Sequence, residues 1–257
     1  MNLELDEKIV LVTGGTSGIG LAIVKSFLEE NACVIVLARN KEKILIQKKN
    51  LQNFVLKKKV FFFQCDCEKL SEVKRTYTKI ISKFGNIEVL INNIGSGKGT
   101  SNVIPEISEW KKVWKKNFTS AYNVVSVFIK DVIKKKGSII FINSIAGKEF
   151  LDAPTAYSTS KTALLTFSKT LSLKYGNIIR VNTISPGNIF SPGGTWDKKI
   201  KKDKAFVKKY IQSNVPANRF GCPEEIAYLA LFLSSSKASF INGSNIVIDG
   251  GQTKSFL

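Results

Sequence analysis

Tyr157 and Lys161 stand four residues apart, and Ser144 precedes the tyrosine by thirteen residues. Side chains four apart lie on one face of a helix, so a helix over 154–175, with Pro154 as its first residue, would place an ammonium group beside a phenol. A phenol titrates at about pH 10, and a neighbouring positive charge favours its phenolate form. Because the chain contains no histidine, we predict that this pair carries the acid–base chemistry.

A glycine-rich segment near the N-terminus is the second stretch that could do chemistry. It spans 13–20, reads TGGTSGIG, and lies between an apolar run and a helical pattern. Glycines permit a tight turn and let phosphate oxygens approach backbone N–H groups, and a helix N-terminus favours anions. The segment therefore predicts a site for the pyrophosphate of a dinucleotide, although its GxxxGxG spacing differs from the general GxGxxG pattern.

The residue that follows the second apolar run predicts the choice of cofactor. An acidic residue at this place would hold the two ribose hydroxyls of NAD, whereas a basic residue would meet the 2′-phosphate of NADP. The chain has Arg39 there and no acid. We therefore expect NADP(H) to be preferred over NAD(H).

Alternating apolar runs and helical segments predict the elements that position these residues. The runs are rich in valine and isoleucine, and their continuous hydrophobicity indicates a sheet that is buried on both faces. The expected strands are 8–13, 33–37, 60–64, 87–91, 138–143, 180–185 and 245–248. This alternation predicts an α/β fold: one Rossmann-like domain over 1–257, with a doubly wound parallel sheet of about seven strands and helices on both faces.

Residues 188–214 interrupt this rhythm with a long insertion that contains SPGGTW at 191–196, followed by a lysine-rich stretch. Long irregular insertions in compact domains are often lids over a site. Trp196 lies between glycines and charged residues. We therefore expect 188–214 to form a lid that contacts the substrate.

The net charge of +19 raises nucleic acid as a partner. Only four of the 39 basic residues are arginines, and the lysines are dispersed along the sequence. Recognition of phosphates and bases favours arginine, so we interpret the charge as a compositional bias of the surface and expect no nucleic-acid partner.

Cysteines and chain ends indicate the compartment. The four cysteines show no metal-ligand spacing, so no metal site is expected, and free thiols such as Cys65 and Cys67 suit a reducing environment. The acidic start at 1–7 differs from a signal peptide, and 255–257 lacks a peroxisomal signal. No apolar run is long enough to span a bilayer. We expect a cytoplasmic protein without a membrane partner.

Taken together, these residues resemble the short-chain dehydrogenase/reductase family over essentially the whole chain, and in particular its bacterial 3-oxoacyl-carrier-protein reductases. The TGxxxGIG motif falls at 13–20, and the NNAG motif at 92–95 has Ile94 in place of alanine. The PG segment is at 186–187, with Ser191 where threonine is usual, and the RxGxPEEIA and DGG motifs are at 219–227 and 249–251.

The resemblance implies roles for individual residues. It implies a catalytic set of Asn117, Ser144, Tyr157 and Lys161, in which the tyrosine donates a proton to a carbonyl and Ser144 hydrogen-bonds the oxygen. Lys161 would hold the nicotinamide ribose and lower the pKa of the tyrosine, and Asn117 would anchor a water. The cofactor contacts that it implies are Gly14, Thr16, Ser17, Gly18, Ile19, Gly20, Arg39, Asp66, Cys67, Asn93, Gly95, Tyr157, Lys161, Pro186, Gly187 and Ile189.

Three functions remain open at this point. The resemblance favours an NADP(H)-dependent reductase of 3-oxoacyl thioesters that forms a homodimer or homotetramer. A dehydrogenase or reductase of a sugar or other polar alcohol, in surface-polysaccharide metabolism, would suit the polar loop at 96–101. A regulator that senses nucleotides or binds nucleic acid could use the same fold without the Tyr157 chemistry.

Overall fold

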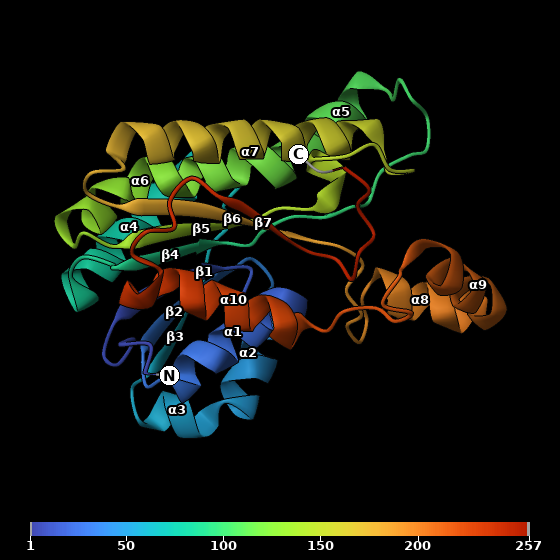
Figure 1. Ribbon diagram of the computed structural model, residues 1–257. Helices are drawn as coiled ribbons and strands as arrows, with labels where there is room; N and C mark the ends of the chain where they lie inside the picture. The colour runs from blue at the N-terminus through green and yellow to red at the C-terminus, as the bar shows by residue number, and fades with distance from the viewer. Residues whose placement is uncertain (1, 256–257) are drawn as a thin grey trace.

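Seven parallel strands form one sheet in the computed structural model, which describes residues 2–255 (Figure 1). The strands are β1 (Ile9–Thr13), β2 (Cys33–Ala38), β3 (Val60–Gln64), β4 (Val89–Asn92), β5 (Ser138–Ile142), β6 (Arg180–Pro186) and β7 (Asn245–Ile248). Their order is β3-β2-β1-β4-β5-β6-β7. The expected doubly wound sheet is confirmed, whereas the expectations for Met1 and for Phe256 and Leu257 lie outside the described residues.

Helices cover both faces of this sheet (Figure 1). The helices are α1 (Gly18–Glu29), α2 (Lys41–Asn50), α3 (Gln52–Leu56), α4 (Leu70–Phe84), α5 (Ile107–Trp114), α6 (Ser120–Lys134), α7 (Thr155–Tyr175), α8 (Thr195–Lys202), α9 (Lys204–Asn214) and α10 (Pro223–Ser234). Three short turns of other types are η1 (Lys115–Thr119), η2 (Ile145–Gly147) and η3 (Ser236–Ala238). Apolar side chains of α1 and α10 pack on one face, and those of α4, α6 and α7 pack on the other. The continuous apolar runs of the strands are explained by this double cover.

The strand order creates a crevice at the carboxyl ends of the central strands. β1 lies between β2 and β4. After β1 the chain continues to β2 on one side, and after β4 it continues to β5 on the opposite side. In open α/β sheets, ligands bind at such a switch point, outside the carboxyl ends of the strands. The glycine turn follows β1 directly, which places it in this crevice.

Some boundaries differ from the expected ones. Pro154 precedes α7 and is not its first residue, because its ψ of 130° is extended; its carbonyl accepts from the amides of Tyr157 and Ser158. The strand expected at 87–91 begins at Val89.

The 188–214 segment is more regular than expected, since α8 and α9 occupy most of it. Asp203 ends α8 and caps α9, where its carboxylate accepts from the amide of Phe206 at 2.8 Å. Asp197 lies in the first turn of α8 and pairs with Lys201 one turn later. Figure 1 shows both helices beside the carboxyl end of the sheet. Within residues 2–255, none of the helices combines the length and the apolar content that crossing a membrane requires.

Candidate active site

A cavity of about 1250 Å³ opens at the carboxyl ends of the central strands. Its size exceeds that of most pockets for small ligands, which hold roughly 300–1,000 Å³, and suits a dinucleotide together with a substrate. The structure brings nearly all the residues singled out in the sequence to this cavity. Of the predicted catalytic and cofactor-contacting residues, all of which the structure describes, only Gly18 and Asn117 do not line the cavity.

The glycine turn forms one end of the cavity. Gly14 has a φ of +69°, which a side chain would strain, and a Cβ on Gly20 would overlap both the amide of Asn93 and the Gly14 carbonyl. Asn93 in turn donates from Nδ2 to the Thr13 carbonyl at 3.0 Å and holds the turn against β4. Ser17 is the N-cap residue of α1, and its side chain makes no capping hydrogen bond. The first N–H groups of α1 are therefore free to bind phosphate oxygens, so the turn fits a pyrophosphate.

Three cations line the adjoining part of the cavity: Arg39, Lys43 and Lys116. Arg39 pairs with Glu68 at 3.2 Å on an exposed surface. Burial lowers the pKa of Lys116, and the positive charge of Arg39 makes a smaller contribution in the same direction. Lys43 and Lys116 were not singled out in the sequence because lysines abound in it. The position of Lys116 directly before Asn117 is the one signal that could have drawn attention to it.

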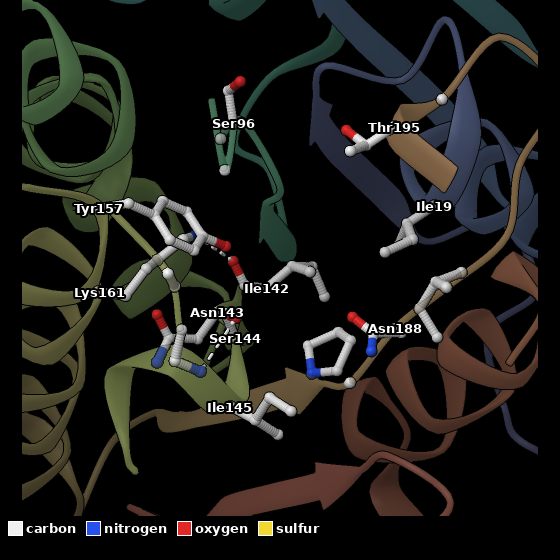
Figure 2. A pocket seen from close by; sticks show the side chains of 18 of the residues that line it. Ile19, Ser96, Ile142, Asn143, Ser144, Ile145, Tyr157, Lys161, Asn188 and Thr195 are labelled. Carbon is white, nitrogen blue, oxygen red and sulfur yellow. Dashed lines mark hydrogen bonds between the residues drawn. The ribbon is translucent and has the colours of Figure 1, made fainter. Parts of the chain in front are cut away.

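Tyr157, Lys161 and Ser144 lie on one wall of the cavity, opposite Ile19 and Thr195 (Figure 2). α7 supplies the tyrosine and the lysine from one face, as expected, and Ser144 follows β5. The Ser144 hydroxyl is hydrogen-bonded to the phenol of Tyr157. Lys161 is only 2% exposed, and its Nζ donates to the Ile142 carbonyl at 3.1 Å.

The expected lowering of the tyrosine pKa by Lys161 is wrong. Burial raises the pKa of Tyr157, and its hydrogen bond with Ser144 offsets only part of this effect. The ammonium of Lys161 lies 5.9 Å from the centroid of the tyrosine ring. Burial also lowers the pKa of Lys161 to about 8. At neutral pH the site therefore holds a protonated phenol beside an ammonium group.

Asn117 lies behind the cavity wall, in η1, a single turn of π-helix. Its side chain donates to the Val113 carbonyl at 3.0 Å, four residues back, and to the Ser96 carbonyl at 3.2 Å. Its Oδ1 accepts from the amide of Ser96 at 2.8 Å. A side chain that takes an i−4 carbonyl competes with the α-helical ladder, which accounts for the wider turn. Asn117 thus fixes the loop after β4, where Gly95 and Ser96 line the cavity.

The outer part of the cavity is built from segments far apart in sequence. Trp196 packs between Tyr210 and Phe220, with ring centroids 4.8 and 4.5 Å away. Asn188 donates to the Tyr210 hydroxyl at 3.0 Å and to Oε1 of Gln252 at 2.6 Å. This network joins the loop after β6 to α9 and to the C-terminal segment. Tyr210 and Gln252 were missed in the sequence, since no local pattern marks such long-range contacts.

The C-terminal segment also contacts the loop between η2 and α7 at the cavity mouth. The amide of Lys254 donates to both carboxylate oxygens of Glu149, at 2.9 and 2.8 Å. The neighbouring Phe150 is almost fully exposed and lines the cavity together with Leu151. The mouth therefore combines an apolar surface with charged groups.

Comparison with known proteins adds independent information on the family. The sequence profile of the family described as Enoyl-(Acyl carrier protein) reductase matches residues 14–253. The 3-oxoacyl-[acyl-carrier-protein] reductase FabG of Chlamydia muridarum is 36% identical over 98% of this chain and 99% of its own length. The enzyme of the same name from Thermotoga maritima is 32% identical over 97% of this chain and 99% of its own.

Solved structures of similar fold include enzymes with a bound cofactor. L-sorbose reductase from Gluconobacter frateurii, in complex with NADPH and L-sorbose, superposes with a TM-score of 0.92 at 29% identity and covers 100% of both chains. The Pseudomonas aeruginosa RhlG/NADP active-site complex gives a TM-score of 0.88 at 28% identity, over 97% of this chain and 98% of its own.

Proposed function

Because the chain belongs to the short-chain dehydrogenase/reductase family, whose members transfer hydride between a nicotinamide cofactor and a carbonyl or CH–OH group, we propose that it is a reductase of 3-oxoacyl thioesters that prefers NADPH. The observation that carries the proposal is the continuity of one cavity from the glycine turn to Tyr157. The relatives named 3-oxoacyl-[acyl-carrier-protein] reductase support this substrate class.

The residues of the cavity suit the cofactor at each end. The glycine turn and the free N–H groups of α1 would bind the pyrophosphate, and Arg39, with Lys43 and Lys116 nearby, would bind a 2′-phosphate. The carboxylate of Asp66 would accept a hydrogen bond from the adenine amino group. When bound, the nicotinamide supplies the hydride. Lys161 would orient the nicotinamide ribose, since its Nζ donates one hydrogen bond to Ile142 and retains two further donors.

Tyr157 and Ser144 would act on the substrate oxygen. Tyr157 keeps its proton at neutral pH because burial raises its pKa, and a protonated phenol can donate to the carbonyl oxygen as negative charge develops there. Ser144 would donate a second hydrogen bond to the same oxygen. A protonated Tyr157 is the form that can act as the acid in the reductive direction at pH 7.

A second candidate is the reduction of a ketose or other polar carbonyl. Asn188, Thr195 and Tyr210 line the outer cavity with groups that can hydrogen-bond sugar hydroxyls. L-sorbose reductase, which was solved with L-sorbose, has the same fold over its full length. The apolar side chains of the exposed Phe150 and the half-buried Leu151 at the mouth favour an acyl chain instead.

Oxidation of NADPH with acetoacetyl thioesters, beside a panel of ketoses, tests the proposal. We expect turnover with the thioester and slower turnover with ketoses, each monitored as loss of absorbance of the reduced cofactor. Turnover with ketoses and none with the thioester would replace the first candidate by the second. The same assay with NADH gives the cofactor preference.

Arg39 is expected to set that preference. In Arg39→Asp, the ratio of kcat/KM with NADPH to kcat/KM with NADH should fall by about 10- to 100-fold, the range for one hydrogen-bonded ion pair. Lys41→Asp is the matched control, because Lys41 is an exposed cation on the same segment that lies outside the cavity lining. An equal fall in both variants would assign the preference to the net charge of the surface and not to Arg39.

A further inference from the structure

Two cysteines flank the residue expected to contact adenine. Cys65 and Cys67 follow β3 on either side of Asp66, and they are 1% and 2% exposed. Both belong to the apolar cluster on the α4 and α6 face of the sheet, and both also line the cavity. Their side chains are hydrogen-bonded to one another. Two neighbouring buried cysteines thus belong both to the core and to the lining of the cofactor crevice.

The backbone around the pair is anchored on both sides. The amide of Cys65 donates to the Ala38 carbonyl at 3.0 Å and extends the pairing of β2 with β3. The Cys67 carbonyl accepts from Asn123 on α6 at 3.0 Å. Between them, the amide of Asp66 donates to Glu72 at 2.9 Å. Because the backbone is anchored at Cys65 and at Cys67, a disulfide that needs a shorter Cα separation would have to be accommodated by the backbone of Asp66 between them.

The two thiols are chemically unequal. The hydrogen bond from Cys67 lowers the pKa of Cys65, with a smaller contribution from Thr76. The same hydrogen bond, together with burial, raises the pKa of Cys67. A thiolate is the attacking species in thiol–disulfide exchange. Cys65 is thus suited to attack first and Cys67 to complete the exchange.

We propose that Cys65 and Cys67 form a reversible disulfide across Asp66 that weakens binding of the adenosine end of the cofactor. Residues two apart have Cα atoms roughly 5.5 to 7 Å apart, which overlaps the separation that disulfides span. The oxidant is a small-molecule disulfide such as oxidised glutathione, which can enter through the cavity. Cofactor in the crevice would cover the thiols and protect them.

The Cys65–Cys67 disulfide would form in two thiol–disulfide exchange steps. The Cys65 thiolate attacks one sulfur of the small disulfide, forms a mixed disulfide and releases one thiol. Cys67 then loses its proton and attacks the Cys65 sulfur, which forms the Cys65–Cys67 bond and releases the second thiol. Two protein thiols are oxidised, one small disulfide is reduced, and the two protons end on the released thiols.

The functional consequence rests on the proposed binding of NADPH in this cavity. Disulfide formation draws the two sulfur atoms into a bond and moves Asp66 between them. Loss of one hydrogen bond to a charged carboxylate corresponds to about a 10- to 100-fold weakening of NADPH binding. We expect reduction by dithiothreitol to restore the original affinity.

The experiment uses the Cys33→Ser/Cys222→Ser protein, in which this pair alone remains of the four cysteines. The protein is incubated with oxidised glutathione, with and without NADPH, and its intact mass and NADPH affinity are measured. We expect the mass to fall by two hydrogen atoms, NADPH binding to weaken by the stated factor, and NADPH to protect the thiols. Cys67→Ser in the same background should instead retain glutathione on Cys65 as a stable mixed disulfide.

Each outcome decides a separate point. Unchanged mass under these conditions, or a disulfide that leaves NADPH affinity unchanged while the reduced protein binds NADPH, overturns the inference and leaves the proposed function intact. A reduced protein that does not bind NADPH overturns the proposed function, and with it the coupling, whereas the change in mass still reports the disulfide.

Discussion

Tyr157→Phe should lower kcat by about 10²- to 10⁴-fold, the usual contribution of a positioned acid–base group. The substitution removes the phenolic proton and keeps the ring that packs near Lys161. NADPH affinity should change little, because the tyrosine hydroxyl is hydrogen-bonded to Ser144, beside which it lies in the cavity (Figure 2), and the proposal assigns it to the substrate oxygen. Steady-state turnover and a direct cofactor titration measure the two effects separately.

Tyr175→Phe provides the matched control for this experiment. Tyr175 ends the same helix and packs partly against the core on the α6 face, outside the cavity lining. Its loss of a hydroxyl should leave kcat within about twofold of the parent enzyme, as expected for a change far from a site. Unchanged turnover in Tyr157→Phe would remove the tyrosine from the proposed chemistry.

Lys161→Met should stabilise the folded protein at pH 7 while it abolishes most of the activity. The drop of the Lys161 pKa from 10.5 to about 8 corresponds to roughly 3 kcal/mol of free energy against the buried ammonium. Loss of the hydrogen bond to Ile142 offsets about 1 kcal/mol of this gain. Methionine retains the apolar length of the side chain without the charge.

The sign of the pH dependence follows from the direction of this shift. Below pH 8, Lys161 is charged in the folded and the unfolded protein, and the full cost of burial applies. Between pH 8 and 10.5 the folded protein has released a proton that the unfolded chain still holds, so the stability of the parent protein rises with pH. The advantage of Lys161→Met should therefore shrink across this window.

Denaturant unfolding at pH 7 and at pH 10 measures that advantage. Lys174→Met on the same helix is the control, because Lys174 is exposed and its removal should change stability by no more than about 0.5 kcal/mol at either pH. A Lys161→Met protein that is less stable than the parent at pH 7 would show that the ammonium stabilises the fold, contrary to the burial argument.

Sequence reasoning was most successful where chemistry and local geometry coincide. The glycine turn, the Tyr157–Lys161 pair and the alternating strands are each specified by residues close together in the chain, so their spacing predicts their placement. Boundaries were less certain: α7 begins one residue later than expected, since the extended backbone of Pro154 precedes the first turn.

Features that depend on burial or distant contacts were not predictable. The raised pKa of Tyr157 results from the depth of the cavity, which no spacing reveals. The Asn188–Gln252 hydrogen bond joins residues 64 positions apart. The π-helical turn around Asn117 reflects competition between a side chain and the backbone for one carbonyl, and local propensity does not predict its outcome.

The hydrogen bonds between the Lys254 amide and Glu149 determine where the protein can be labelled without obstructing the cavity. Residues 2–8 precede β1 at the amino ends of the strands, where Glu4 pairs with Lys237 beyond α10. Residue 254 instead lines the mouth of the cavity. A fluorophore attached at residue 254 would therefore lie at the entrance of the cavity, whereas the same fluorophore near Glu4 would leave that entrance clear.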